Sequence, residues 1–237
     1  MLKAIIFDFG QTLADSANGF RTAEKEAQDE IFRNIGILER EDFQARYRRI
    51  RKSFHDRSDF SRKKMWRELY SELDLEPDGD LLEKWQDRYW NTVEDRTALF
   101  PETLAVLERL SSRYELAVIT NTQGNPAATE HRLRRFPQIE KIISTVIVAG
   151  EDGLPPKPHP RPFGLCLERL GRRPGEAVFV GDDWRIDICG ARNAGIRPIW
   201  LRHRLVVRNW PEVEETAPVI TSLDPLLVIE YIVTINS

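Results

Sequence analysis

The apolar run Ala4-Ile5-Ile6-Phe7 and the acid that follows it constrain the fold more than any other stretch. An apolar run without alternating polar residues is typical of a strand that is buried on both faces of a parallel sheet. Asp8 comes directly after the run, so we expect it at the carboxyl end of this strand. Open α/β sheets bind their ligands at that edge, and Asp8 is therefore the first candidate functional residue.

Apolar runs of the same kind recur in the second half of the chain, separated by amphipathic stretches that predict helices. An alternation of strands and helices is typical of a doubly wound parallel sheet. The sequence therefore predicts an α/β core with a Rossmann-like parallel sheet. The later expected strands are Tyr114–Ile119, Ile142–Val148, Ala177–Val180, Arg197–Leu201 and Val219–Thr221, and the expected helices include Arg161–Leu170 and Leu223–Val233.

The segment between Asp15 and Asp95 differs from this core, because its apolar residues recur only at helical spacing. The four amphipathic runs in it are Phe20–Ile35, Phe43–Phe54, Trp66–Leu73 and Leu82–Tyr89. We therefore expect an α-helical domain at residues 16–96, inserted into a core domain that is formed by residues 1–15 and 97–237.

The composition is that of a globular protein, with 41% hydrophobic and 31% charged residues and a formal net charge of -3 over 237 residues. This balance gives no general attraction to nucleic acid or to anionic lipid. No apolar run approaches the roughly 18 residues of a membrane span, so we expect no membrane association. Cys166 and Cys189 lie in predicted helices and are interpreted as small buried apolar residues. Such sparse cysteine usage suits a cytoplasmic location, which we expect here.

Residues 46–67 form a basic stretch, with ten basic residues against two acids and with aromatic residues between them. The pattern superficially resembles a nucleic-acid-binding surface. Its apolar members nevertheless fall at helical core positions, which favours two helices with basic solvent-facing sides. We therefore do not expect a nucleic-acid partner. An alternative stays open: if part of the stretch faces the substrate cleft, its charge would favour a substrate that carries more negative charge than one phosphate monoester. The oligomeric state is not predicted.

Polar residues that could bind a ligand or take part in catalysis fall at comparable places in separate parts of the predicted core. They are Asp8, Thr120 and the group Asp182, Asp183 and Asp187 after predicted strands, and Lys157 in a loop rich in proline and glycine. Each residue alone is a weak signal, since a single Asp or Thr at such a place more often caps a helix or lies in a turn. Because the carboxyl ends of parallel strands share one edge, we expect these residues to converge.

In this order the residues resemble the four motifs of the haloacid dehalogenase superfamily, which is dominated by phosphatases and opens with a strand and Asp-x-Asp-x-Thr. Asp8 and Thr12 match the first motif. Position 10 departs from it, because Gly10 stands where the family has the second Asp. The resemblance covers essentially the whole chain and implies that residues 16–96 are an α-helical cap on a haloacid dehalogenase-like core.

For the function, the resemblance implies an Mg2+-dependent hydrolase of small phosphate monoesters that acts through an aspartyl-phosphate on Asp8. The implied metal ligands are Asp8, Asp182 and the backbone carbonyl of residue 10, which Gly10 retains. Asp187 would hold the metal's water shell or Lys157.

The resemblance also implies which residues handle the phosphoryl group. Lys157 would neutralise its charge and orient Asp8, and Thr120 would bind the oxygens that gain charge in the transition state. Asn121 and Thr12 are the further expected substrate-binding residues. The expected partner is a small phosphorylated metabolite.

Gly10 removes the group that serves the family as general acid and base. Its loss should slow turnover by on the order of 10²- to 10⁴-fold if nothing replaces it. Asp15 and Asp183 are the nearby acids that we nominate as substitutes. For Asp15, its place at the hinge of the helical insertion favours a structural role. For Asp183 and Asp187, capping of the next helix is an equally good interpretation.

Three functions remain compatible with the sequence, and a phosphatase that tolerates Gly10 is favoured. The second is a 2-haloacid dehalogenase, the branch that has no Asp at this position because halide leaves without a proton. Those dehalogenases carry neutral residues where this chain has Asp182 and Asp183. Without a metal these carboxylates would repel a carboxylate substrate. The third is a non-catalytic relative that binds a phosphorylated ligand or a partner.

Overall fold

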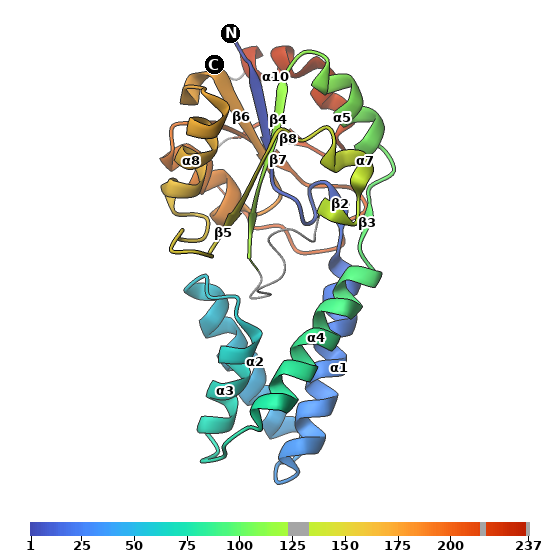
Figure 1. Ribbon diagram of the computed structural model, residues 1–237, viewed down its shortest axis with the longest axis vertical. Coiled ribbons are helices and arrows are strands. Elements are labelled where there is room, and N and C mark those ends of the chain that lie inside the picture. Colours follow the sequence, from blue (N-terminus) through green and yellow to red (C-terminus); the bar gives the residue numbers. More distant parts are fainter. Residues whose placement is uncertain (123–132, 214–216, 236–237) are drawn as a thin grey trace. The chain divides into compact units, whose positions relative to one another are not determined.

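The computed structural model describes residues 1–122, 133–213 and 217–235, which fold into two compact units (Figure 1). One unit contains Met1–Asp15, Ala98–Asn121 and the described chain from residue 133 onward. It holds a parallel sheet with helices on both faces. The other unit contains Ser16–Thr97 and is helical.

A six-stranded parallel sheet forms the first unit, in the order β5-β4-β1-β6-β7-β8. Its strands are β1 (Ala4–Phe7), β4 (Glu115–Asn121), β5 (Thr145–Ala149), β6 (Ala177–Gly181), β7 (Arg197–Leu201) and β8 (Val219–Ile220). The strand order reverses at β1, because the strands on both of its sides come later in the chain. This arrangement confirms the predicted doubly wound α/β core, and such a reversal marks the ligand-binding edge of a sheet.

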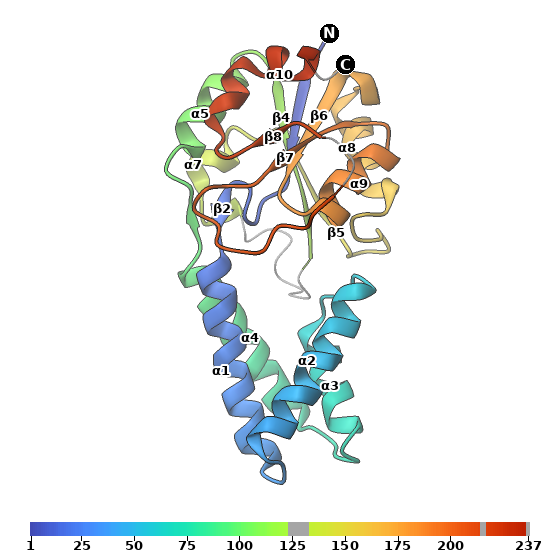
Figure 2. The same cartoon turned by 180° about the vertical axis from the view of Figure 1, so that it is seen from behind.

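Helices cover both faces of the sheet, as the continuous apolar run of β1 predicts. They are α5 (Thr103–Ser111), α7 (Pro137–Glu140), α8 (Pro160–Leu170), α9 (Cys189–Asn193) and α10 (Ile229–Ile235), with short helical turns η1 (Pro174–Glu176), η2 (Trp184–Ile188) and η3 (Asp224–Val228). Ile5 and Phe7 belong to the core under α5 and α10, whereas Ala4 and Ile6 belong to the core under α8 and α9. Figure 2 shows α8 and α9 on one side of the sheet and α5 and α7 on the other.

The register of the central strands aligns the predicted functional residues. Phe7 pairs with Val118 of β4 on one side and with Val180 of β6 on the other. The N–H of Asp8 donates to the carbonyl of Val180 at 2.9 Å, so Asp8 continues the ladder at its carboxyl end. The last residues of β4 and the residue after β6, which is Asp182, therefore lie at the same edge as Asp8.

For two strands, the predicted first residue lies before the first residue of the strand in the structure. The N–H of Tyr114 donates to the carbonyl of Leu110 at 2.9 Å, so Tyr114 closes helix α5 and β4 starts only after it. The N–H of Ile142 likewise donates to the carbonyl of Ile139 at 3.0 Å, in the turn that precedes β5. Both residues contribute to the apolar core or pack against it, which explains why their composition resembles that of a strand.

Four helices form the second unit, as predicted from the spacing of apolar residues. They are α1 (Ala17–Ile35), α2 (Arg40–Asp56), α3 (Arg62–Ser71) and α4 (Gly79–Asp95), and their buried side chains form a core of their own. Local signals set the ends: Gly36 closes α1 with a φ of 66°, a conformation that favours glycine, and Asp78 caps α4. None of the described helices combines the length and the apolar character of a bilayer-crossing segment.

A short ribbon lies where the chain leaves the first unit after Asp15 and returns to it at Ala98. Strand β2 (Ala14–Asp15) pairs antiparallel with β3 (Ala98–Leu99). Thr97 lies with the helical unit and is bound to α4, and the predicted domain bounds, 16–96 for the helical domain, stay a prediction. The N–H of Thr97 donates to the carbonyl of Glu94 at 3.2 Å and its hydroxyl to that of Val93 at 2.7 Å.

A buried polar network joins three helices of the second unit. Tyr89 of α4 donates its hydroxyl to Oε2 of Glu24 in α1 at 3.1 Å, and it accepts from Nη2 of Arg62 in α3 at 3.1 Å. Burial raises the pKa of Tyr89 to about 12, so its hydroxyl stays protonated and can donate. Because polar groups in an apolar core need their partners, this network fixes how α1, α3 and α4 pack.

The basic stretch is largely paired within its own unit. Eight of the ten basic residues at positions 46–67 form ion pairs with acids of the helical unit. Arg49, for example, lies 2.5 Å from Glu72, and Lys52 lies 2.6 Å from Asp56. Exposed pairs of this kind add little stability, but they neutralise the surface. They support the interpretation of basic solvent-facing sides and give no support to a nucleic-acid surface.

Gly19 marks a close approach of α1 to α4, and replacing it tests this packing. A Cβ at this position would lie 2.6 Å from the carbonyl oxygen of Val93. We expect Gly19→Ala to lower the free energy of unfolding by about 1–3 kcal/mol, even though alanine favours a helix. Gly79→Ala is the matched control, because nothing lies within 4 Å of the place that its methyl group would take. Urea unfolding followed by circular dichroism measures both. Equal stability of the two variants would contradict the close contact.

Candidate active site

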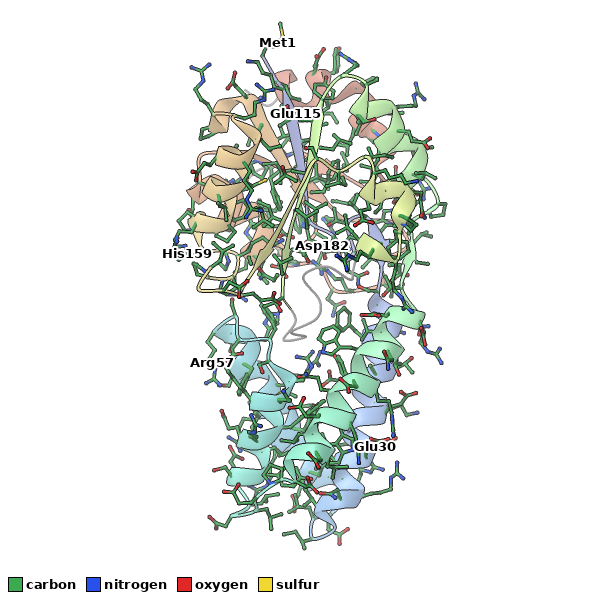
Figure 3. All side chains as sticks on the ribbon, viewed as in Figure 1. Met1, Glu30, Arg57, Glu115, His159 and Asp182 are labelled. Atoms are coloured by element: carbon green, nitrogen blue, oxygen red, sulfur yellow. The ribbon has the colours of Figure 1, made fainter. Side chains whose placement is uncertain are left out.

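Three acids from separate segments meet at the carboxyl edge of the sheet. Asp8 follows β1, Asp182 follows β6 and Asp187 belongs to η2; all three are buried, and each offers an oxygen within 4.8 Å of the others. We call these three residues the acidic cluster. In Figure 3, Asp182 lies at the opposite end of the sheet from Glu115, the first residue of β4. The predicted convergence of these acids is thus present in the structure.

Lys157 lies between two members of the acidic cluster. Its Nζ donates to Oδ1 of Asp8 at 2.7 Å and to Oδ1 of Asp187 at 2.7 Å, and its side chain is only 1% exposed. Burial alone would lower the pKa of Lys157, but Asp187 and Asp8 outweigh it and hold the pKa above its ordinary value. The ammonium group is therefore charged and held at a fixed place beside Asp8.

Asn121 holds the backbone that carries Lys157. Its Oδ1 accepts from the N–H of Lys157 at 2.8 Å, and its Nδ2 donates to the carbonyl of the same residue at 3.1 Å. The end of β4 thereby fixes the loop that follows β5. The side-chain amide of Asn121 serves this purpose, and the substrate-binding role that the sequence suggested for Asn121 stays a prediction.

Asp187 reaches the cluster because a π-helical turn follows β6. Asp183 caps this turn by accepting from the N–H of Ile186 at 2.9 Å, and the N–H of Asp183 donates to Oδ2 of Asp187 at 3.1 Å. The capping role considered for Asp183 is therefore present, whereas Asp187 points into the cluster. Gly181 leaves the necessary space, since a Cβ there would lie 2.5 Å from Cβ of Asp187.

Asp182 has a partner that the sequence did not indicate. Nη1 of Arg208 lies 2.7 Å from Oδ2 of Asp182, and Nη2 donates to the backbone carbonyl of Asp182 at 2.6 Å. The indole N–H of Trp200 donates to the same carbonyl at 2.9 Å. Arg208 belongs to the loop between β7 and β8, where no motif marks it. The only signal available was that a loop leaving the carboxyl end of β7 starts at the edge that holds Asp182.

The loop after Asp8 is a tight turn. Gly10 forms a β-bridge with Ala14. Gln11 has a φ of 62°, a backbone conformation that is rare for residues other than glycine. Thr12 is fully buried, and its Oγ1 has no hydrogen-bond partner among the described residues. The carbonyl of Gly10 as a metal ligand and Thr12 as a substrate contact stay predictions.

Two further residues of the sequence prediction have clear positions. Thr120 is buried next to the end of β4, in the strand adjacent to β1, and its contact with a phosphoryl group stays a prediction. Asp15 lies in β2 and pairs with Ala98, which agrees with the hinge role.

The electrostatics of the acidic cluster favour a cation. Burial raises the pKa of Asp182 well above its ordinary value, with Asp187 and Asp8 adding to the effect and Arg208 opposing it. Burial and Asp8 also raise the pKa of Asp187, to about 7, against the opposing charge of Lys157. Three buried carboxylates thus share two basic partners. Carboxylate oxygens are the ligands that Mg2+ prefers, so the residues present fit a hard divalent cation.

A comparison with known families agrees with this geometry. A family model described as haloacid dehalogenase-like hydrolase matches residues 2–195. The chain belongs to this family. The hydrolase has curated relatives that span nearly its whole length. A glyceraldehyde 3-phosphate phosphatase of Pyrococcus furiosus is 29% identical over 229 residues, which cover 95% of this chain and 92% of the relative.

Further comparisons point the same way. A phosphoglycolate phosphatase of Salmonella typhimurium is 31% identical to the hydrolase over 220 residues, which cover 85% of this chain and 82% of the relative. Among solved structures, a haloacid dehalogenase family phosphatase from Thermococcus onnurineus is similar in fold, with a TM-score of 0.68 and 24% identity over 97% of this chain and 98% of its own. The hydrolase therefore has phosphatase relatives and the fold predicted for it.

Gly181 gives a direct test of how the cluster is built. In Gly181→Ala the new methyl group would occupy the place of the Asp187 side chain, so we expect the contact of Asp187 with Lys157 to be lost. Hydrolysis of p-nitrophenyl phosphate should fall by on the order of 10²-fold, the size expected when a catalytic group shifts by about 1 Å. Gly164→Ala in α8 is the control, because nothing lies within 4 Å of its Cβ position. Wild-type turnover by Gly181→Ala would contradict this packing.

Proposed function

We propose that the hydrolase cleaves small phosphate monoesters in an Mg2+-dependent reaction, with Asp8 as the nucleophile. The observation that carries this proposal is the position of Asp8 in the buried acidic cluster, where its carboxylate accepts a hydrogen bond from Lys157. Among the described contacts, the hydrogen bond to the Asp8 carboxylate falls on Oδ1. Oδ2 is therefore the oxygen that we assign to attack on phosphorus.

The residues account for the nucleophilic attack and for the charge of the phosphoryl group, and solvent supplies the proton and the water. Oδ2 of Asp8 attacks phosphorus, the bond between phosphorus and the ester oxygen breaks, and the leaving alcohol takes a proton from solvent. Water then hydrolyses the aspartyl-phosphate and releases phosphate. Lys157 orients Asp8 and offsets the charge of the phosphoryl group, and Asn121 keeps Lys157 in place.

The acidic cluster supports the proposed metal, because it gathers the carboxylate oxygens that Mg2+ prefers. Asp8 and Asp182 would hold Mg2+ with the carbonyl of Gly10, and Asp187 would act through its hold on Lys157 or on the metal's water. When bound, the cation supplies the positive charge that lets a carboxylate approach a phosphate dianion.

The substrate class is proposed from the relatives. The two curated phosphatases named above act, by their names, on glyceraldehyde 3-phosphate and on phosphoglycolate. We therefore propose a small phosphorylated metabolite for this chain, with these two compounds as the first to be tested. A cytoplasmic location stays a prediction.

Turnover of p-nitrophenyl phosphate with and without Mg2+ tests the reaction. We expect hydrolysis that requires Mg2+ and that falls by at least about 10³-fold in Asp8→Asn, because the nucleophile is lost. Asp152→Asn, in the loop that precedes Lys157, is a control with the same change of side chain. Activity retained in Asp8→Asn would contradict the mechanism. Chloride release from 2-chloropropionate without metal would favour dehalogenation, and metal binding without any turnover would favour a non-catalytic relative.

Gly10→Asp tests whether leaving-group protonation is what the chain lacks. Wild-type protein should prefer p-nitrophenyl phosphate to an alkyl phosphate, since nitrophenolate leaves without a proton. An Asp at position 10 should raise the alkyl phosphate rate by on the order of 10²-fold or more, and the p-nitrophenyl rate by less. Gly10→Asn is the control, because it adds a similar side chain that cannot transfer a proton. An equal gain from both variants would show that the effect is not acid catalysis.

A further inference from the structure

We propose that Arg208 is a built-in counter-ion of Asp182 that sets how tightly the acidic cluster binds a divalent cation. The inference rests on the metal site of the proposed function and deepens it by naming a positioning residue outside the motifs. Arg208 approaches Asp182 with both ends of its guanidinium: Nη1 lies 2.7 Å from Oδ2, and Nη2 donates to the backbone carbonyl at 2.6 Å. This grip restrains the side chain and the backbone of Asp182 together.

The loop that carries Arg208 is anchored on one side by His203. The His203 ring is buried and stacks on Phe100, with 3.6 Å between ring centroids, and its Nε2 lies 2.9 Å from Oε1 of Glu102. The N–H of Leu205 donates to Nδ1 of His203 at 3.2 Å, so Nε2 is the nitrogen that donates to Glu102. The loop therefore leaves β7 along a path that is fixed against the start of α5.

An aromatic ring supports the guanidinium on its other side. The centre of the Arg208 guanidinium lies 4.1 Å from the ring centroid of Trp210, within the range of a cation–π contact. Trp200 packs against Trp210, with 6.0 Å between centroids, and bonds to the same carbonyl of Asp182 as Arg208 does. The position of Arg208 is thus set by its surroundings as well as by the carboxylate it contacts.

The charges of the site explain what this contact does. Lys157 is shared by Asp8 and Asp187, which leaves Arg208 as the partner of Asp182 among the described ion pairs. The described hydrogen bonds to this carboxylate fall on Oδ2, so Oδ1 remains for a cation. Arg208 stabilises the cluster before a cation binds, and its positive charge repels the cation that arrives. Affinity for the cation is therefore lower than three carboxylates alone would give.

The test compares Arg208→Met with Arg202→Met after removal of metal with EDTA. The guanidinium of Arg202 lies 5.2 and 5.6 Å from the ring centroids of Trp200 and Trp210, so this control removes a neighbouring cation that stacks on the same rings. Mg2+ titration by calorimetry should show on the order of tenfold tighter binding in Arg208→Met and wild-type binding in Arg202→Met. Without metal, Arg208→Met should unfold about 5 °C below Arg202→Met, since it leaves Asp182 buried without its partner.

Two further variants distinguish a failure of the counter-ion role from a failure of the metal site. Arg208→Lys keeps the charge and should bind Mg2+ nearly as the wild type does. Asp182→Asn should abolish Mg2+ binding and should also remove the stability difference between Arg208→Met and Arg202→Met. Mg2+ binding that is unchanged or weaker in Arg208→Met, while the wild type binds, would overturn the counter-ion role alone. Absence of Mg2+ binding in the wild type would overturn the metal site and the inference together.

Discussion

The buried ammonium group of Lys157 holds the site together. It bonds to Asp8 at the end of β1 and to Asp187 in η2, while Asn121 at the end of β4 grips its backbone. Removing such an ion from a buried network leaves its partners uncompensated, which typically costs several kcal/mol. The ends of three strands and the loop after a fourth are thus joined through one residue. The geometry proposed for catalysis and the packing of this edge depend on the same contacts.

The sequence predicted the core and most of the acidic cluster, because both follow from short-range patterns. A continuous apolar run means a strand buried on both faces, and the parallel register of β1 then carries Asp8 and Asp182 to one edge. The helices of the second unit could be predicted equally well, since their apolar residues recur at helical spacing over four helices. Errors fell at the ends of elements, at Tyr114 and Ile142, where turn hydrogen bonds that leave no periodic trace decide the boundary. The predicted helix Leu223–Val233 is also divided in the structure, into the 3-10 turn η3 and the helix α10.

Other parts of the site could not be predicted, because they depend on contacts between distant segments. Arg208 meets Asp182 in a loop whose preceding turn is fastened by His203 to Glu102, a residue about a hundred positions earlier in the chain. The hold of Asn121 on Lys157 likewise joins the end of β4 to the loop after β5, and the two segments share no motif. A sequence pattern reports on neighbours along the chain, so partnerships of this kind become visible only in three dimensions. The resemblance to a family supplied residue roles, but it did not include these partners.

The central place of β1 has a consequence for how the molecule folds. This strand is synthesised before both of its partners, β4 and β6, which come after the helical segment in the sequence. Contacts between residues far apart in sequence form slowly, because a long loop must close first. Helices α1 to α4 all lie within the continuous segment Ser16–Thr97, so their packing needs no such closure. On the ribosome, we expect the helices to pack before β4 and β6 have been synthesised, while the apolar strand β1 is still unpaired.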